Sequence, residues 1–179
     1  MSDIVELHGK SFEVFLTEEE IRQRVWEMGQ DISRDYKGKI PIIISVLNGS
    51  FIFAADLVRV LDIQLKVEFV RLASYEGESS SGKVIEILGL RNEVEGEDIL
   101  IVEDIVDTGL TLSKFVAEVK SRNPNSVKVV SLLQKPAAIE HPVDIDYIGF
   151  EIPNDFVLGY GLDFDEVGRE LPQIYKLME

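Results

Sequence analysis

The chain has 179 residues, 45% of them hydrophobic, enough for one well-filled core and too few for two full domains, so residues 1–179 are expected to form a single domain. Its 33 acidic and 18 basic residues give a net charge of −15, which repels nucleic acid and argues against such a partner. The absence of cysteine excludes disulfides, thiol catalysis and cysteine-ligated metals.

The first predicted element is a helix that begins after Thr17. Thr17 and Glu20 have the spacing of a capping box, in which each side chain accepts a hydrogen bond from the other residue's backbone N–H. The pattern predicts an amphipathic helix to about Tyr36, with its apolar stripe in the core. The stripe consists of Ile21, Val25, Met28 and Ile32. Whether the preceding segment, 2–13, packs on the domain or on a partner is left open.

The next part of the chain alternates strand and helix patterns. Strands are predicted at 40–47, 65–71 and 84–88, and a helix at 51–61. Between the second and third of these strands, residues 74–83 are polar and small. We expect this stretch to form a flexible lid.

The remaining elements complete an α/β pattern. Further strands are predicted at 99–102, 127–133 and 147–150, with a helix near 111–121. Strands that alternate with helices favour a mostly parallel central sheet flanked by helices. Residues 141–175 are rich in loops and short strands, so they are expected to form a small hood over the active edge of the sheet.

The most informative segment is 99–111, in which an apolar run leads into two acids and then a small, hydroxyl-rich turn. The turn would lie at a strand's carboxyl end, where open parallel sheets bind ligands and where a starting helix presents free N–H groups to a phosphate. Glu103 and Asp104 are left to face a sugar. The expected phosphate cradle is Asp107, Thr108, Gly109, Leu110 and Thr111.

This segment resembles the 5-phosphoribosyl-1-pyrophosphate (PRPP) motif of the type I phosphoribosyltransferases, and every motif position is filled. The resemblance implies that family's α/β fold, with a small hood from the carboxyl- and amino-terminal parts of the chain and a flexible lid loop. It extends over about 47–171 and narrows to the hypoxanthine and hypoxanthine-guanine phosphoribosyltransferases. In that family the turn at Leu47, Asn48 and Gly49 binds pyrophosphate through backbone N–H groups. The resemblance also implies a strained or cis peptide between Leu47 and Asn48, a pyrophosphate contact from Arg169, and a lid headed by Ser74 and Tyr75.

The purine site is also implied by the resemblance. Lys135 corresponds to the lysine that donates to the purine's exocyclic oxygen at carbon six. Phe156 would stack on the base, and Val157 would bind it through backbone groups. Asp163 is implied beside the purine as the ligand of a second Mg²⁺, while Glu103 and Asp104 would engage the ribose hydroxyls or their metal. Oxygen ligands of this kind favour Mg²⁺.

The predicted reaction is transfer of the phosphoribosyl group from PRPP to N9 of hypoxanthine, with guanine as an expected second base. Asp107 is the candidate general base at purine N7. Two alternatives stay open: an enzyme of the same fold that prefers xanthine, and a PRPP-sensing regulator without catalysis. After Lys135 the chain reads Pro-Ala-Ala, where many relatives carry basic residues, so the charge at this edge is lower than usual.

The expected setting is cytoplasmic. The amino terminus lacks the basic and apolar regions of a secretory signal, and no apolar run approaches the roughly 20 residues that a membrane helix needs. The resemblance implies a homodimer or homotetramer that acts on small molecules.

Overall fold

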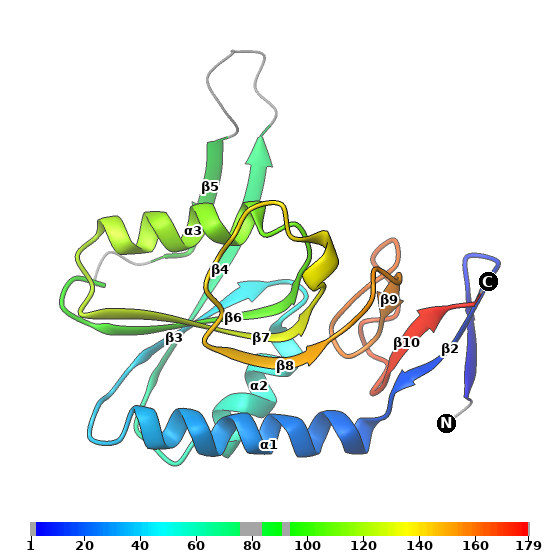
Figure 1. Ribbon diagram of the computed structural model, residues 1–179, viewed down its shortest axis with the longest axis horizontal. Helices are drawn as coiled ribbons and strands as arrows, with labels where there is room; N and C mark the ends of the chain where they lie inside the picture. Colours follow the sequence, from blue (N-terminus) through cyan, green and yellow to red (C-terminus); the bar gives the residue numbers. More distant parts are fainter. Residues whose placement is uncertain (1–2, 76–83, 91–93, 179) are drawn as a thin grey trace.

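The computed structural model describes residues 3–75, 84–90 and 94–178. It contains a six-stranded sheet with strand order β5-β4-β3-β6-β7-β8 and a four-stranded sheet with order β1-β2-β10-β9. Figure 1 shows the larger sheet with helices on both faces and the smaller sheet to one side of it. We call the smaller sheet, with the loops between β9 and β10, the hood.

The elements have the following bounds. The larger sheet contains β3 (Ile42–Leu47), β4 (Lys66–Tyr75), β5 (Val84–Leu88), β6 (Asp98–Val106), β7 (Ser126–Gln134) and β8 (Tyr147–Glu151). The hood contains β1 (Ile4–Leu7), β2 (Lys10–Leu16), β9 (Val157–Leu158) and β10 (Ile174–Leu177). The helices are α1 (Glu18–Asp35), α2 (Phe51–Val60) and α3 (Leu110–Ser121), with a 3₁₀ turn at Pro136–Ala138.

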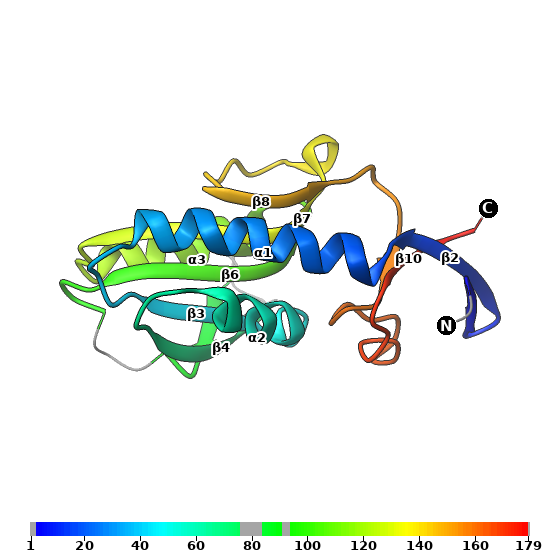
Figure 2. The ribbon, with the colours of Figure 1, turned by 90° about the horizontal axis from the view of Figure 1, so that it is seen from below.

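The mostly parallel sheet predicted from the sequence is confirmed. β3, β4, β6, β7 and β8 pair in parallel, and β5 runs antiparallel to β4. Helices α1 and α2 cover one face and α3 covers the other (Figure 2). Because both faces are covered, the central strands bury nearly continuous apolar runs, and Ile43, Ile44, Ile99, Leu100, Ile101 and Val102 are all buried.

The first helix forms as the capping box predicts. The hydroxyl of Thr17 accepts a hydrogen bond from the backbone N–H of Glu20, and the Glu20 carboxylate accepts one from the backbone N–H of Thr17. The predicted stripe is buried against the sheet: Ile21, Val25, Met28 and Ile32. In the described parts of the chain, no helix is both long and apolar enough to cross a bilayer.

Two strands are longer than their apolar runs predict. β4 continues to Tyr75 and β6 continues through Glu103 to Val106, because backbone pairing extends beyond the apolar residues. Ser74 and Tyr75 therefore lie at the end of a strand, opposite β5, instead of within a loop. Residues 76–83 of the expected lid lie outside the described residues.

The hood has different limits from the expected range of 141–175. β8 lies within that range but pairs with β7 in the larger sheet, whereas β1 and β2, from the amino terminus, pair with β10 in the hood. The physical reason is a separate apolar cluster in which Phe12 packs with Leu158 and Tyr175. The amino-terminal segment thus packs on its own chain.

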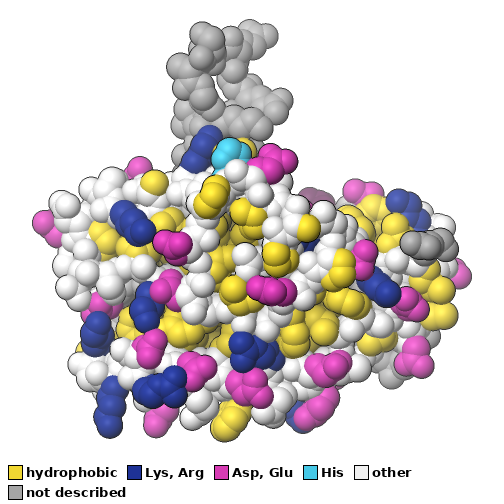
Figure 3. Space-filling view, viewed as in Figure 1, with side chains coloured by type: hydrophobic (Ala, Val, Ile, Leu, Met, Phe, Trp, Pro, Cys, Tyr) yellow, Lys and Arg dark blue, Asp and Glu magenta, His cyan; other side chains and the backbone are white. Residues whose placement is uncertain are grey.

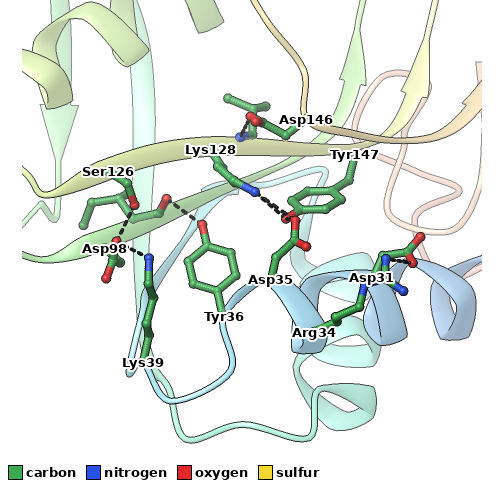
Figure 4. A network of polar contacts seen from close by, with 12 residues as sticks. Asp31, Arg34, Asp35, Tyr36, Lys39, Asp98, Ser126, Lys128, Asp146 and Tyr147 are labelled. Atoms are coloured by element: carbon green, nitrogen blue, oxygen red, sulfur yellow. Dashed lines mark hydrogen bonds and ion pairs between the residues drawn. The ribbon is translucent and has the colours of Figure 1, made fainter.

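A polar network joins α1 to β7 and β8 near the amino ends of the strands (Figure 4). The Asp35 carboxylate accepts hydrogen bonds from Lys128 Nζ at 2.9 Å and from the Tyr147 hydroxyl at 2.6 Å. Lys39 forms an ion pair with Asp98 at 3.2 Å, beside the start of β6. On the face in Figure 3, Lys and Arg side chains are interspersed with Asp and Glu rather than gathered in one patch.

Candidate active site

The carboxyl ends of three neighbouring parallel strands, β3, β6 and β7, meet at one edge of the larger sheet. Ligands bind at this edge in open α/β sheets because the loops that leave the strands converge there. A cleft of about 290 Å³ opens at the ends of β3 and β6. It is lined by Val46, Leu47, Leu72, Glu103, Ile105, Val106, Asp107, Thr108, Gly109, Leu110, Thr111 and Leu112.

The turn from β6 to α3 is held in place by the loop after the 3₁₀ turn. The carbonyl of Thr108 accepts hydrogen bonds from the backbone N–H groups of Glu140 and His141. Gly109 has φ +79°, and a Cβ there would lie 2.3 Å from the carbonyl oxygen of His141, so the turn requires glycine. Thr108 and Thr111 remain exposed at the start of α3, where their hydroxyls and the helix N-terminus can meet an anion.

Two adjacent carboxyl groups lie beside this turn at the end of β6. Burial raises the pKa of Glu103 well above its usual range, and the neighbouring charge of Asp104 raises it further. Burial also raises the pKa of Asp104 to about 6, although the backbone N–H of Ile105 partly offsets this effect. Glu103 lines the cleft, and among the described residues its Oε2 atom is buried without a hydrogen-bond partner.

The turn after β3 is packed against Asp104 and the hood. The peptide between Leu47 and Asn48 is cis. A Cβ on Gly49 would lie 1.4 Å from Oδ2 of Asp104, and a Cβ on Gly161 would lie 2.1 Å from the carbonyl oxygen of Gly49. Below the turn, the buried Ser50 hydroxyl donates to the carbonyl of Val46. The turn is therefore fixed between β6 and the hood.

Lys135 follows β7 and lies next to Asp107. Its Nζ is 3.4 Å from Oδ2 of Asp107, and its side chain is only 12% exposed while that of Asp107 is 53% exposed. The backbone N–H of Lys135 donates to the carbonyl of Val106, which aligns the ends of β6 and β7. A sheltered ammonium and an accessible carboxylate therefore lie side by side at the edge.

The hood contributes the remaining candidates. Phe156 is 45% exposed, whereas Val157 is buried in β9. Asp163 forms an ion pair with Arg169 at 2.7 Å, and Nη1 of Arg169 donates to the carbonyl of Gly161 at 2.8 Å. The positive charge of Arg169 partly offsets the burial that raises the pKa of Asp104.

The structure thus brings together most of the predicted site residues, from the 47–49 turn, β6, the 107–111 turn and Lys135. Ser74 and Tyr75 stand at the end of β4. No group of three potential metal-ligating side chains occurs among the described residues, and Asp163 is engaged by Arg169. The predictions missed Gly161 and His141, whose backbones press on the two turns. In the sequence, these contacts were indicated only by the glycines themselves, Gly49, Gly109 and Gly161. A glycine suggests that another part of the chain approaches closely, but it does not show which part.

Residues 13–165 match the family model of the phosphoribosyl transferase domain. The chain belongs to the phosphoribosyltransferase family. The hypoxanthine-guanine phosphoribosyltransferase of Dictyostelium discoideum is 45% identical, in an alignment that covers 94% of this chain and 97% of that protein. The enzyme of the same name from Mycobacterium tuberculosis is also 45% identical, over 90% of this phosphoribosyltransferase and 83% of its relative.

Solved structures agree with this family assignment. A ternary substrate complex of the hypoxanthine phosphoribosyltransferase from Trypanosoma cruzi has a TM-score of 0.86 and 44% identity, covering 92% of this chain and 94% of that one. A hypoxanthine-guanine phosphoribosyltransferase from Bacillus anthracis, with HEPES in its active site, has a TM-score of 0.85 and 33% identity. The match covers 93% of this chain and 98% of that one. The phosphoribosyltransferase described here therefore has the type I fold that the resemblance implied.

Proposed function

We propose that this phosphoribosyltransferase converts hypoxanthine and guanine, with PRPP, to IMP and GMP, and releases pyrophosphate. The observation that carries the proposal is the juxtaposition, at one sheet edge, of the 107–111 turn, the buried acids of β6 and the Lys135–Asp107 pair. A phosphate cradle, sugar-facing acids and a polar pair for a base match the three parts of the product nucleotide. The activity named for the relatives supports the same reaction.

The phosphoribosyl half would bind to the β6–α3 turn. Backbone N–H groups at the start of α3 and the hydroxyls of Thr108 and Thr111 would hold the 5′-phosphate, because an unpaired helix N-terminus favours an anion. Gly109 allows the close approach of that phosphate. Glu103 and Asp104 would engage the ribose hydroxyls or the metal bound to them.

The donor set of β6 fits Mg²⁺. Mg²⁺ in nucleotide sites is held by one or two carboxylates together with substrate oxygens, and the buried Oε2 of Glu103 is an available hard ligand. Glu103 and Asp104 would hold one ion, and Asp163 would hold a second after release from Arg169. When bound, Mg²⁺ would supply positive charge that neutralises the leaving pyrophosphate.

The pyrophosphate would bind at the 47–49 turn. Backbone N–H groups of Leu47, Asn48 and Gly49 and the guanidinium of Arg169 would bind it. Ser74 and Tyr75 would head a lid that excludes water, which matters because water would capture a ribosyl cation.

The base would bind under the hood. The partly exposed Phe156 would stack on the purine, and backbone groups of Val157 would bind the edge of the base. Lys135 would donate to the oxygen at carbon six, which disfavours an amino group there. Asp107 would accept or stabilise the proton at N7 as N9 attacks, a role for which its accessible carboxylate at this edge is suited.

A steady-state assay tests the proposed function. The purified protein is incubated with PRPP and Mg²⁺, and nucleotide formation is followed in parallel with hypoxanthine, guanine, xanthine and adenine. We expect turnover with hypoxanthine and guanine. Preference for xanthine would change the assigned substrate, and PRPP binding without turnover on any base would replace the enzyme with a PRPP-sensing regulator.

The proposal includes a homodimer or homotetramer of single-domain, cytoplasmic subunits. Large apolar side chains are exposed on the surface, among them Phe51 at 42% on α2 and Phe69 at 48% on β4. Exposed apolar surface of this kind favours association between subunits. Light scattering coupled to size-exclusion chromatography should give a multiple of the monomer mass, and a monomer would contradict this part of the proposal.

A further inference from the structure

The purine-stacking candidate Phe156 is in contact with a second aromatic ring that no part of the proposed reaction uses. The ring centroids of Phe156 and Phe164 are 5.3 Å apart and their planes meet at 72°, the edge-to-face arrangement that aromatic pairs prefer. The ring of Phe12 lies 6.2 Å from Phe156 and 6.0 Å from Phe164. Phe12 is fully buried, so it forms the base of this three-ring group.

Phe164 is in turn held by the tip of the amino-terminal hairpin. His8 and Gly9 both have positive φ, so β1 and β2 are joined by a tight two-residue turn that fixes the hairpin's register. The His8 ring meets Phe164 edge-on at 5.0 Å, and Nζ of Lys10 lies 5.2 Å from the Phe164 ring centre. An aromatic edge and a cation therefore both contact this ring.

The backbone of Phe164 is also restrained. Phe164 and Val167 exchange backbone hydrogen bonds at 2.9 and 3.2 Å, and the two residues between them, Asp165 and Glu166, have positive φ. The residue before Phe164 is Asp163, whose carboxylate pairs with Arg169. Backbone and ring restraints together leave Phe164 little freedom to move.

We propose that Phe164 is a positioning residue that holds the ring of Phe156 ready to receive the purine, with the β1–β2 hairpin as its brace. The inference rests on the proposed function, because it assumes that Phe156 stacks on the base. A ring already held in its bound orientation loses less conformational entropy when the ligand binds. Since Phe156 would touch the base and not the phosphoribosyl group, the effect of Phe164 falls on the purine alone.

The test compares Phe164→Leu with Phe164→Tyr and a matched control. Loss of one aromatic contact in Phe164→Leu should raise the KM for hypoxanthine by roughly 2- to 12-fold. The KM for PRPP should not change, and Phe164→Tyr should keep the wild-type KM for hypoxanthine. Phe15→Leu is the control. Phe15 lies on the same strand as Phe12, and Nζ of Lys176 lies 5.8 Å from its ring centre. It packs against the core cluster that contains the apolar stripe of α1, and not against the three-ring group.

The outcomes separate this inference from the proposed function. If the wild-type protein turns over hypoxanthine and Phe164→Leu leaves its KM unchanged, the positioning role is wrong while the enzyme assignment stands. Equal increases in the KM for PRPP and for hypoxanthine, or an equal effect of Phe15→Leu, would show a general structural role and would also overturn the inference. A wild-type protein that acts on no purine would remove the proposed function itself.

Discussion

The adjacent carboxyl groups of Glu103 and Asp104 lie in a buried position that disfavours their charged forms. The pKa of Glu103 is well above its usual range, and that of Asp104 is raised to about 6. An acid whose pKa is higher in the folded state binds more protons there, so the free energy of unfolding falls as pH rises from about 4 toward 7. A bound metal ion or ribose hydroxyls would interact with these carboxyl groups and offset this loss of stability.

The double variant Glu103→Gln, Asp104→Asn should therefore be more stable than the wild type at neutral pH. We expect a gain on the order of 1–3 kcal/mol in the free energy of unfolding at pH 8, shrinking toward pH 4.5, together with loss of activity. Urea denaturation at the two pH values measures the gain. A variant that is no more stable than the wild type at pH 8 would refute the assigned burial cost.

Gly49 gives a second prediction for a single residue. Its φ is not left-handed, so the only obstacle to alanine is space, and the added Cβ would lie 1.4 Å from Oδ2 of Asp104. In Gly49→Ala, the methyl group and the Asp104 carboxyl must move apart. This should misplace the turn and lower kcat/KM for PRPP by roughly 100-fold. Gly96→Ala is the control, since nothing lies within 4 Å of its Cβ position. It should cost some stability without changing the KM for PRPP, whereas equal kinetics for both variants would contradict the assigned crowding.

Among the elements, α1 is joined to β7 and β8 at its carboxyl end by the network of Asp35, Lys128 and Tyr147. Hydrogen bonds from Tyr147 and Lys128 lower the pKa of Asp35, and hydrogen bonds with Tyr147 and Asp35 raise the pKa of Lys128. The stabilisation from Asp35 is present above its unfolded pKa and is lost as pH falls through its lower folded value. The stabilisation from Lys128 is fully present below the unfolded pKa of lysine and is lost only as pH rises through the higher folded pKa.

Lys128→Met should consequently destabilise the protein by about 0.5–1.5 kcal/mol, a modest value because the pair is partly exposed. The loss should be constant between pH 6 and 9, since both groups stay charged there, and should shrink below about pH 4. Thermal denaturation across this range measures it, with the exposed Lys120→Met as control. A loss that varied strongly between pH 6 and 9 would show that another group is responsible.

The predictability of each element depended on how local its signals are. α1 and the parallel strands β3 and β6 follow from a capping box and apolar runs, which are contained in adjacent residues. The extension of β4 to Tyr75 and the joining of β2 to β10 depend on pairing between distant residues, for which polar or short segments carry no local signal. For the same reason the range 141–175 expected for the hood differs from the observed hood, which excludes β8 and includes β1 and β2.

At the scale of the whole molecule, the site is completed by contact between the larger sheet and the hood. Gly161 packs on Gly49, the charge of Arg169 acts on the pKa of Asp104, and the Tyr160 hydroxyl donates to Asp56 of α2 at 2.7 Å. The 107–111 motif could be assigned from sequence because its chemistry lies in consecutive residues. The packing of Gly161 and His141 on the two turns could not, because it depends on how distant segments meet.

Since both parts contribute to the proposed site, substrate binding should stabilise the whole chain. With Mg²⁺ and PRPP at about 100 times its Kd, binding should raise the free energy of unfolding by about 2.7 kcal/mol. This corresponds to a rise in Tm of roughly 5–10 °C. Differential scanning fluorimetry measures the shift in Tm. At the same concentration as PRPP, ribose 5-phosphate, which lacks pyrophosphate, should give a smaller shift. Equal shifts with both ligands would mean that the 47–49 turn and Arg169 take no part in binding.

The central claim is that the chemistry occurs at the sheet edge with Asp107 as its base. Its most direct test is the steady-state comparison of the wild type with Asp107→Asn on hypoxanthine, PRPP and Mg²⁺, using the exposed loop variant Asp144→Asn as control. We predict that Asp107→Asn lowers kcat by roughly 10²- to 10⁴-fold with little change in the KM for PRPP, while the control is unaffected. Near-normal turnover by Asp107→Asn would contradict the account and remove Asp107 from the chemistry.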